Sequence, residues 1–274
     1  MASAAPSEVL RFEDVSLHFD GVKALEHVSF SMNAGESRVV FGAAGAGKTV
    51  MLKTALGLVK PDSGRVFLFG QDITDLKESA MYALRAKVGI LFQEGGLFDS
   101  LTIAENVAYP LVNQQTRTAS DANFQAGVDA KVQQTLNFVE LGNTLEKFPS
   151  EVSGGMRRRV GIARAVVTEP PFVLYDSPTA GLDPITANLI VDLLIKERDV
   201  LDTAAILVTH RYQDGHLMAN FRYNPDSGRI EPARGAEGQV KTKFFVMEEG
   251  RLVFEGSEAE LRASQDAYVR KFVK

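Results

Sequence analysis

The stretch Gly42-Ala43-Ala44-Gly45-Ala46-Gly47-Lys48-Thr49 decides the fold of this sequence. It matches the pattern G-x-x-x-x-G-K-[ST], with a short apolar strand before it at 37–41 and a helical pattern after it. Glycines let the backbone wrap around a phosphate, and successive N–H groups then form a nest for an anion beside the positive end of the helix. The stretch therefore predicts a phosphate-binding loop, in which Lys48 reaches the β- and γ-phosphates of a nucleotide and the Thr49 hydroxyl ligates Mg²⁺.

A second part of the same site is expected at Asp176. The apolar run from Phe172 to Tyr175 predicts a buried strand, which would place this carboxylate at the carboxyl edge of the sheet, beside the phosphate loop. A carboxylate there can hold Mg²⁺ through water. A lone aspartate before Ser177 and Pro178 would more often begin a turn, but the phosphate loop favours the metal site.

The hydrophobic pattern of the chain predicts an α/β fold. Residues 8–41 favour strands, 88–92 and 204–209 are typical of buried strands, and 184–199 favour a helix. Strands that alternate with helices indicate a mostly parallel sheet with helices on both faces. From about 94 to 168 the pattern is mainly helical, and we expect an inserted subdomain with helices at 103–111, 128–141 and 154–167.

Two stretches fall outside this alternation. The polar stretch 114–125 predicts a loop. The turn-rich stretch 220–240 predicts an exposed hairpin or flexible loop, with a regulatory or partner contact as the alternative. The chain returns to alternating strands at 244–247 and 252–254, and a terminal helix is predicted over 257–272.

The composition fits a globular protein with a sizeable core. Of the 274 residues, 45% are hydrophobic and 24% are charged. The net charge of -5 gives no general attraction to nucleic acids, and the lack of cysteine excludes disulfides and cysteine-ligated metals. The sequence has no signal-peptide pattern and no apolar run near the ~18 residues of a membrane span. A membrane role would therefore go through a partner.

Residues 151–160, EVSGGMRRRV, closely resemble the signature motif of ABC ATPases, usually written LSGGQ. Ser153 is a good helix N-cap, and Gly154 and Gly155 leave bare N–H groups at the helix start. Met156 takes the place of the usual glutamine. In that family this helix end meets the γ-phosphate held by the opposite subunit, so the resemblance implies two ATP molecules between two copies of the chain.

Further residues match the family in its order along the chain. Gln93 follows a strand and resembles the glutamine that senses Mg²⁺ and the attacking water, and His210 resembles the switch histidine that contacts the γ-phosphate. The run 180–183, with Asp183, resembles the D-loop that crosses the dimer interface. Phe19 stands where an aromatic residue usually stacks on adenine, although it could also belong to the core.

The resemblance implies one domain over residues 1–274. Its parts would be a P-loop NTPase core with a mostly parallel sheet and an N-terminal antiparallel β subdomain (8–92 and 169–274), and an inserted α-helical subdomain (about 94–168). The implied cofactors are ATP and Mg²⁺. The implied partners are a second nucleotide-binding subunit, most simply another copy, and an integral membrane permease at the cytoplasmic face of the inner cell membrane.

Three stretches look like the Mla/Mce-type branch of this family, which includes toluene-tolerance transporters: 92–111, Met156 and 183–186. The branch implies a bacterial system that moves phospholipids or other hydrophobic compounds, with a substrate-binding Mce-domain protein. Three apolar residues near Gln93 either line the groove for a permease helix or pack within the helical subdomain: Leu97, Phe98 and Leu101. The basic run 157–159 predicts a solvated helix face, since the acidic chain disfavours nucleic-acid binding.

Ser177 departs from the family pattern, which has a glutamate at this position. That glutamate orients the attacking water, and general-base assistance is worth about 10²–10⁴-fold in rate, whereas serine is uncharged and a poor base. Hydrolysis could be slow, with Gln93 and His210 positioning the water, or another carboxylate such as Asp183 could substitute. The subunit could also be mainly an ATP-gated clamp. A non-transport ABC protein is a further alternative, which the single cassette disfavours.

Overall fold

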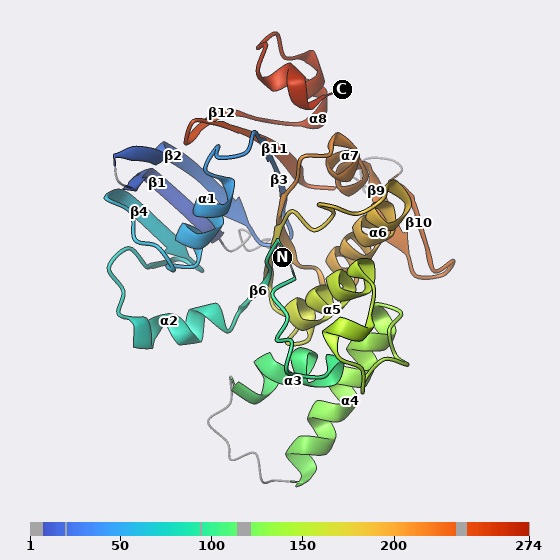
Figure 1. Cartoon of the computed structure of the whole chain (residues 1–274). Helices are drawn as coiled ribbons and strands as arrows, with labels where there is room; N and C mark the ends of the chain where they lie inside the picture. Colours follow the sequence, from blue (N-terminus) through green and yellow to red (C-terminus); the bar gives the residue numbers. More distant parts are fainter. Residues whose placement is uncertain (1–7, 20, 94, 114–121, 234–239, 274) are drawn as a thin grey trace, which may run out of the picture.

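The computed structural model describes residues 8–19, 21–93, 95–113, 122–233 and 240–273. Its centre is a six-stranded sheet in the order β12-β11-β3-β8-β7-β6 (Figure 1). Neighbouring strands are parallel except for the β11–β12 pair, which is antiparallel. The strands are β3 (Ser37–Gly42), β6 (Val88–Leu91), β7 (Phe172–Asp176), β8 (Ala204–Val208), β11 (Thr242–Glu248) and β12 (Arg251–Gly256). The predicted mostly parallel sheet is confirmed.

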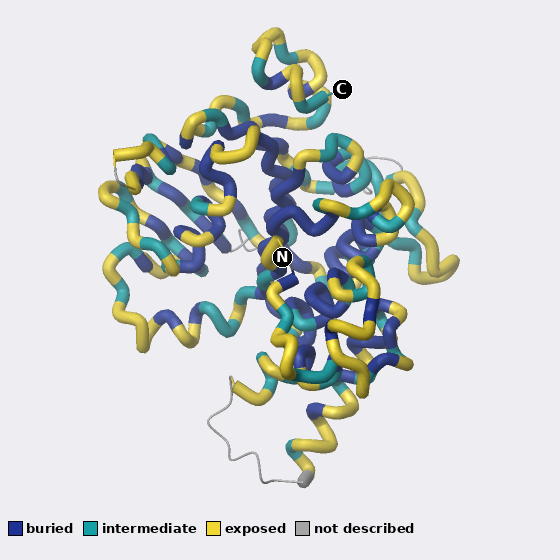
Figure 2. Tube along the Cα trace, viewed as in Figure 1, coloured by how far each residue is buried: buried dark blue, intermediate teal, exposed yellow. Residues whose placement is uncertain are grey.

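A second sheet covers one face of the first. It has four antiparallel strands in the order β2-β1-β4-β5, namely β2 (Val22–Asn33), β1 (Glu8–Phe19), β4 (Ser63–Leu68) and β5 (Gln71–Asp72). Along β3 the side chains alternate between two hydrophobic cores: Val40 packs with the residues of this second sheet, whereas Val39 and Phe41 pack with the helices on the other face. The central strands are therefore buried on both sides, as Figure 2 shows in dark blue.

Eight helices surround the sheets in the part of the chain that the structure describes. They are α1 (Lys48–Ala55), α2 (Glu78–Arg85), α3 (Ile103–Asn113), α4 (Ala122–Phe138), α5 (Gly154–Val166), α6 (Pro184–Leu201), α7 (Tyr212–Asn220) and α8 (Glu258–Ala263). Helices α3, α4 and α5 gather in one part of the molecule, below the central sheet in the view of Figure 1. Within the described ranges, none of the helices combines the length and the apolar character needed to cross a bilayer.

Two predictions of secondary structure are wrong in detail. The terminal helix predicted over 257–272 is two short pieces, α8 and a 3₁₀ turn (Val269–Phe272), because Ser264 is extended and the Asp266 carboxylate accepts hydrogen bonds from the N–H groups of Tyr268 and Val269. The loop predicted over 114–125 ends early, because residues 122–125 already belong to α4, and residues 114–121 lie outside the described part. The sequence pattern also did not predict α2.

The stretch 220–240 contains a hairpin of β9 (Phe221–Asn224) and β10 (Arg229–Pro232), and residues 234–239 lie outside the described part. Its base is attached to α6. The Asp199 carboxylate accepts a hydrogen bond from the Tyr223 N–H at 2.8 Å, and the Arg198 guanidinium donates to the Phe221 carbonyl at 2.8 Å. The hairpin is therefore anchored at its base, while its far end at 225–229 is exposed.

Candidate functional site

The phosphate loop lies between β3 and α1, where close packing excludes side chains at two glycines. Gly47 is the N-cap of α1 with φ 97°, and a Cβ atom there would lie 2.3 Å from the Ala24 carbonyl oxygen. A Cβ atom on Gly42 would lie 2.6 Å from the Met247 carbonyl oxygen. The backbone is therefore held tightly between β2 and β11 while residues 43–45 stay exposed, as a cradle for a phosphate requires.

Lys48 extends under this loop and is only 7% exposed. Its ammonium donates to the carbonyl oxygens of Gly42 at 2.8 Å and Ala43 at 2.7 Å. Burial lowers the pKa of Lys48, and the negative charge of Asp176 opposes this shift. A cation held this way beside exposed loop N–H groups is suited to bind the terminal phosphates of a nucleotide.

Asp176 lies at the end of β7 and meets the start of α1, as the sequence predicts. It is 4% exposed, and its Oδ2 accepts a hydrogen bond from the Thr49 hydroxyl at 2.8 Å. Among the described residues, no group of three His, Asp or Glu side chains could hold a metal ion. One hydroxyl and one carboxylate fit Mg²⁺, which keeps several waters and takes further oxygens from a substrate phosphate.

Ser177 is buried beside Asp176 in a left-handed backbone conformation with φ 53°. Its N–H donates to the Val208 carbonyl at 2.9 Å, which fixes it against β8. Its hydroxyl donates to Asp176 Oδ1 at 3.2 Å. Both oxygens of the Asp176 carboxylate therefore accept from hydroxyl groups, and the position of the family glutamate carries no charge.

His210 and Gln93 follow strands β8 and β6 of the same sheet, which lie on either side of β7. Burial and the positive charge of Lys48 lower the pKa of His210, while Asp176 and a hydrogen bond to the Gly42 backbone oppose this. At neutral pH the imidazole is therefore mainly neutral and lies against the phosphate loop. Gln93 is exposed after β6, and its backbone carbonyl accepts a hydrogen bond from Arg158.

A buried carboxylate that sequence reasoning missed joins two parts of the site. Asp214 in α7 has no exposed surface, and its Oδ2 accepts hydrogen bonds of 2.6 Å from the hydroxyls of Thr179 and Thr209. Burial raises the pKa of Asp214, and these hydroxyls oppose the shift. The contact ties the turn after Ser177 to the residue before His210. No sequence pattern indicates this contact, because its partners come from separate segments.

The C-terminal segment also reaches the phosphate loop. The Ala43 N–H donates to the Tyr268 hydroxyl at 3.0 Å, and that hydroxyl donates to the Met247 carbonyl at 3.1 Å. The Phe272 ring stacks on Phe41, the residue before the loop, with centroids 6.0 Å apart. Tyr268 is thus a second site residue that no sequence motif indicated.

The predicted signature residues form a separate, exposed part of the surface. Ser153 caps α5 by accepting a hydrogen bond from the Met156 N–H at 3.3 Å. A groove here is lined by residues 153–156 together with 181–183, and none of the described residues that line it belongs to 42–49. A Cβ atom on Gly155 would lie 2.7 Å from Thr186 Cγ2, so α5 packs closely on α6.

Asp183 acts as the N-cap of α6. Its Oδ1 accepts hydrogen bonds of 3.0 Å from the N–H groups of Ile185 and Thr186. Hydrogen bonds from Thr186, above all, lower the pKa of Asp183. A carboxylate that is engaged as a cap and has a lowered pKa is a weak base, which disfavours Asp183 as a substitute for the family glutamate.

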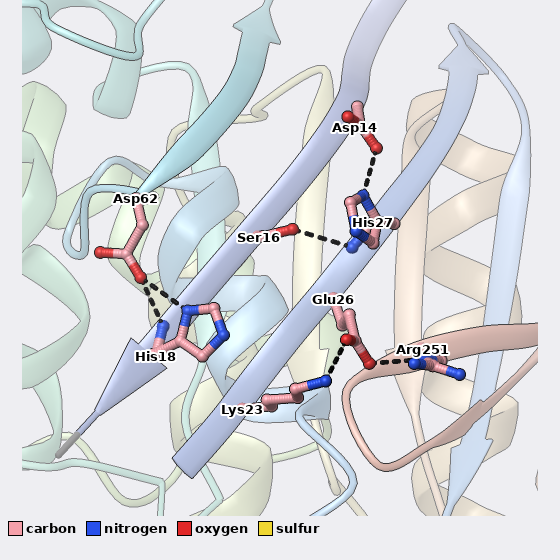
Figure 3. Close-up of polar contacts among 8 residues, drawn as sticks. All are labelled: Asp14, Ser16, His18, Lys23, Glu26, His27, Asp62 and Arg251. Carbon is pink, nitrogen blue, oxygen red and sulfur yellow. Dashed lines mark hydrogen bonds and ion pairs between the residues drawn. The ribbon is translucent and has the colours of Figure 1, made fainter. Parts of the chain in front are cut away.

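Phe19 ends β1 and is 45% exposed, so the interpretation as a core residue is wrong. The adjoining strand β2 is fastened beside the phosphate loop. Figure 3 shows Glu26 between Lys23 and Arg251, and the pair with Arg251 joins β2 to the start of β12. The Glu26 N–H donates to the Gly250 carbonyl at 2.9 Å, and the Gly250 N–H donates to the Ala46 carbonyl at 3.2 Å.

The prediction of a solvated helix face for the basic run 157–159 holds for Arg157, which is exposed, but it is wrong for Arg158, which is buried. The Arg157 guanidinium donates to the Val152 carbonyl at 2.8 Å, and Arg159 donates to the Val139 carbonyl at 3.3 Å. Arg158 is 9% exposed and donates to backbone carbonyls of two loops. Hydrophobic periodicity could not reveal this, because arginine counts as polar wherever its guanidinium ends.

An exposed aromatic groove lies beside Gln93. Phe92, Phe98 and Tyr109 are 39%, 41% and 43% exposed, and the rings of Phe98 and Tyr109 are 4.6 Å apart. All three line one groove with residues of β6 and α5. Leu97 instead packs against the core. Of the two alternatives, packing within the core therefore applies to Leu97 but not to Phe98, and a permease helix in the groove stays a prediction.

The model of the ABC transporter family matches residues 25–180 of this chain. The chain belongs to this ABC transporter family. The match contains the loop 42–49, Gln93, the signature residues 153–156, Asp176 and Ser177, and it ends before Asp183 and His210.

Curated relatives of this chain are named as ATP-binding proteins of transport systems. A probable ribonucleotide transport ATP-binding protein of Mycobacterium tuberculosis (strain H37Rv) is 36% identical over 192 residues, which cover 70% of this chain and 52% of the relative. The methionine import ATP-binding protein MetN of Rhizobium etli is 34% identical over 241 residues, 88% of this chain and 64% of the relative. The chain thus spans about half to just under two thirds of these relatives.

Solved ABC structures share the fold over nearly the whole chain. A dimeric post-hydrolysis state of the ATP-binding cassette MJ0796 bound to ADP and Pi has a TM-score of 0.74 at 25% identity, covering 91% of this chain and 98% of that one. CbiO1 from Clostridium perfringens, part of an ABC transporter complex, has a TM-score of 0.75 at 26% identity, covering 94% and 92%. The predicted fold class is confirmed.

Proposed function

We propose that this chain is the ATP-binding subunit of an ABC transporter, which binds MgATP in the phosphate loop and hydrolyses it to drive a permease. The observation that carries the proposal is the convergence of Lys48, Thr49 and Asp176 at the carboxyl edge of the sheet. This is the place where open α/β sheets bind ligands. The family membership supports the same assignment.

In this proposal the residues of the loop bind and orient the nucleotide. Residues 42–49 surround the phosphates with N–H groups, and Lys48 neutralises charge on the terminal phosphates. Thr49, Asp176 and Gln93 would hold Mg²⁺, which supplies further charge neutralisation when bound. His210, mainly neutral and beside Gly42, contacts the γ-phosphate side. Phe19 has the exposure that stacking on adenine requires.

The residues that complete the nucleotide site would come from another copy of the chain. The start of α5 presents Ser153, Gly154 and Gly155 at an exposed groove with Asp183. The first N–H groups of a helix have no partner within the helix and favour an anion. We infer that this surface caps the nucleotide held by the loop of the partner, so that two MgATP molecules lie between two subunits.

A second candidate function is an ATP-gated clamp with slow hydrolysis. It is favoured by Ser177, whose buried hydroxyl donates to Asp176 and offers no base. Asp183 is engaged as a helix cap. In this candidate, binding closes the dimer, and Gln93 with His210 positions the water for a slow reaction.

The permease would dock at the aromatic groove of Phe92, Phe98 and Tyr109, which adjoins Gln93. An exposed apolar groove is the kind of surface that takes an amphipathic helix. The cargo would be a phospholipid or another hydrophobic compound, with an Mce-domain protein as a further partner, and the subunit would lie at the cytoplasmic face of the inner membrane. The resemblance of 92–111 to the Mla/Mce branch supports this, whereas the relatives are named for other cargo.

A lysine pair on α1 tests nucleotide binding. Lys48→Ala should weaken MgATP binding about 100-fold, since it removes a charge-assisted contact from a buried site. Lys53→Ala, on the exposed face of the same helix, should change it less than about twofold. Titration with a fluorescent ATP analogue gives the affinity, and light scattering with and without MgATP gives the dimer. Equal effects of the two variants, or binding without dimers, would count against the proposal.

Tests of the docking groove and of the cargo require the permease. Phe98→Glu should reduce co-purification with the permease about tenfold, because it places a charge in an apolar contact. Tyr82→Glu, on the exposed face of α2, is the matched control. Transport of labelled phospholipid by the reconstituted complex then tests the cargo. Transport of a ribonucleotide or methionine in place of lipid would contradict the lipid assignment but not the ATPase.

A further inference from the structure

Arg158 occupies an unusual position for a charged residue in a helix that begins at an exposed groove. It lies in the second turn of α5 and is only 9% exposed. Its Nη1 donates to the Gln93 carbonyl, and its Nη2 donates to the Ala180 carbonyl at 3.3 Å. One side chain thus joins α5 to two loops that are 87 residues apart in the sequence.

The guanidinium group makes this connection a rigid one. It is planar, always charged and presents its N–H groups in a fixed fork. Two carbonyls bound to one fork are held at a fixed spacing from each other and from the helix that carries the arginine. A lysine, with one compact charged group on a flexible stem, does not impose that spacing.

Both loops carry residues that the proposed function uses, namely Gln93 in the first, and Ser177 and Asp183 in the second. Gln93 follows β6 beside the aromatic groove. Ala180 closes the turn that contains Ser177, since its N–H donates to the Ser177 carbonyl at 3.1 Å, and it leads to Asp183. The helix itself begins at Ser153, on the surface assigned to the partner nucleotide.

We propose that Arg158 is a positioning residue that makes the start of α5, the loop at Gln93 and the turn 177–183 move as one unit. Contact of the Ser153 end of α5 with the nucleotide of a second copy would then be transmitted to Gln93 and Ser177 within the same chain. This inference rests on the proposed function, and it assigns a role to Arg158, which no sequence motif explains.

Two neighbouring arginines on α5 provide matched controls. Arg157 donates to the carbonyls of Val152 at 2.8 Å and Pro149 at 3.4 Å, which lie outside both loops. Arg164 donates to the carbonyls of Gly95 and Gly96 at 2.8 Å each. It therefore holds the segment after Gln93 without contacting Ala180. A merely structural role of arginine on this helix would affect all three variants alike.

Hydrogen exchange tests the physical link. In Arg158→Met, amide exchange should accelerate about tenfold in peptides of both 88–93 and 177–183, because both loops lose an anchor. Arg157→Met should change neither peptide, and Arg164→Met should leave the 177–183 peptide unchanged. Arg158→Lys should restore protection incompletely. Unchanged exchange in the 177–183 peptide of Arg158→Met would overturn the proposal.

Kinetics test the functional consequence. Arg158→Met should lower kcat for MgATP about tenfold or more, with KM changed less than about twofold, because misplaced groups affect the reacting geometry more than binding. In a double-mutant cycle, Gln93→Ala should cost much less in the Arg158→Met background than in the wild type, and its cost should be unchanged in Arg157→Met. A kcat equal to that of Arg157→Met, or fully additive effects, would overturn the proposal while the proposed function stands. A wild-type protein that neither binds nor hydrolyses MgATP would overturn the proposed function itself.

Discussion

The two halves of the candidate site are held in different ways. The phosphate half, residues 42–49 with 176–177 and His210, is cross-linked from several elements, and Lys48 and Asp176 are almost entirely buried. The signature half, residues 153–156 with 181–183, is exposed or half-buried, and Ser153 and Asp183 in it act as helix N-caps. The first half is therefore preorganised within one chain, whereas the second offers its polar groups outward.

This difference follows from the charges that each half carries. A buried ammonium and a buried carboxylate are costly unless each has hydrogen-bond partners, so the phosphate half requires a fixed network. The signature half contains glycines and a serine at a helix start, whose N–H groups can stay solvated until an anion arrives. The comparison predicts that changes in the signature half affect assembly and hydrolysis but not nucleotide binding by the monomer.

Gly154→Asp tests the signature half, and it should have the largest effect on dimer formation and hydrolysis. A Cβ atom on Gly154 meets only Arg157 Nη2 within 4 Å, at 3.8 Å, so a side chain fits. A carboxylate at a helix start is compatible with folding, but it would repel a phosphate. Like charges brought together cost several kcal/mol, so dimer formation and hydrolysis should fall about 100-fold or more. Affinity of the monomer for MgATP should stay within about twofold.

Two measurements separate the halves in this variant. Nucleotide titration below the dimerisation concentration reports the phosphate half, and steady-state ATPase activity with light scattering reports the assembled site. Gly154→Ala is the control, because it adds volume without charge. The comparison between the halves is wrong if the aspartate variant loses nucleotide affinity as strongly as it loses activity.

Ser177→Glu tests the phosphate half. It should raise ATP turnover at least about tenfold, since it adds a general base. Ser177 already has φ 53° as a non-glycine residue, so the substitution introduces no new class of backbone strain. Ser177→Gln has nearly the same shape without the base and serves as the control. Equal or lower ATPase activity in the glutamate variant would count against the argument from the missing glutamate.

The sequence predicted the residues of the phosphate half better than the contacts that hold them in place. The loop 42–49 is continuous, and Asp176 ends a strand whose apolar pattern is plain, so the pattern alone brings them to one sheet edge. The mostly parallel sheet follows from the same alternation. These features depend on residues that are close in sequence or on rules for parallel sheets, which a single sequence can reveal.

The residues that hold the site in place contact segments that are distant in the sequence, and a single sequence does not reveal such contacts. Ala43 and Tyr268 are 225 residues apart, and nothing near either residue indicates the other. Arg158 counts as polar in a helical pattern, yet it is buried because its head group reaches carbonyls of two loops. The terminal helix is broken at Ser264 by local turn bonds that compete with helical ones.

Tyr268→Phe tests how far the phosphate half depends on such a distant support, and its effect should be the smallest. The hydroxyl accepts from the Ala43 N–H and donates to the Met247 carbonyl, so its removal deletes two hydrogen bonds near the loop. Water can replace the partner of the exposed Ala43 N–H, whereas Met247 is buried, so the net loss should be about 1–2 kcal/mol of unfolding free energy. Urea unfolding measures it.

The matched control for this substitution is Tyr82→Phe, because Tyr82 is 68% exposed on α2. It should leave the urea midpoint unchanged, whereas Tyr268→Phe should lower the midpoint and leave the slope unchanged, since the same surface is exposed on unfolding. Affinity for MgATP should fall a few-fold at most in Tyr268→Phe, because the loop keeps its contacts to β2 and β11. If both variants unfold at the same urea concentration, the C-terminal segment does not stabilise the phosphate half, and the cross-links from Lys48, Asp176 and Asp214 are sufficient to hold it.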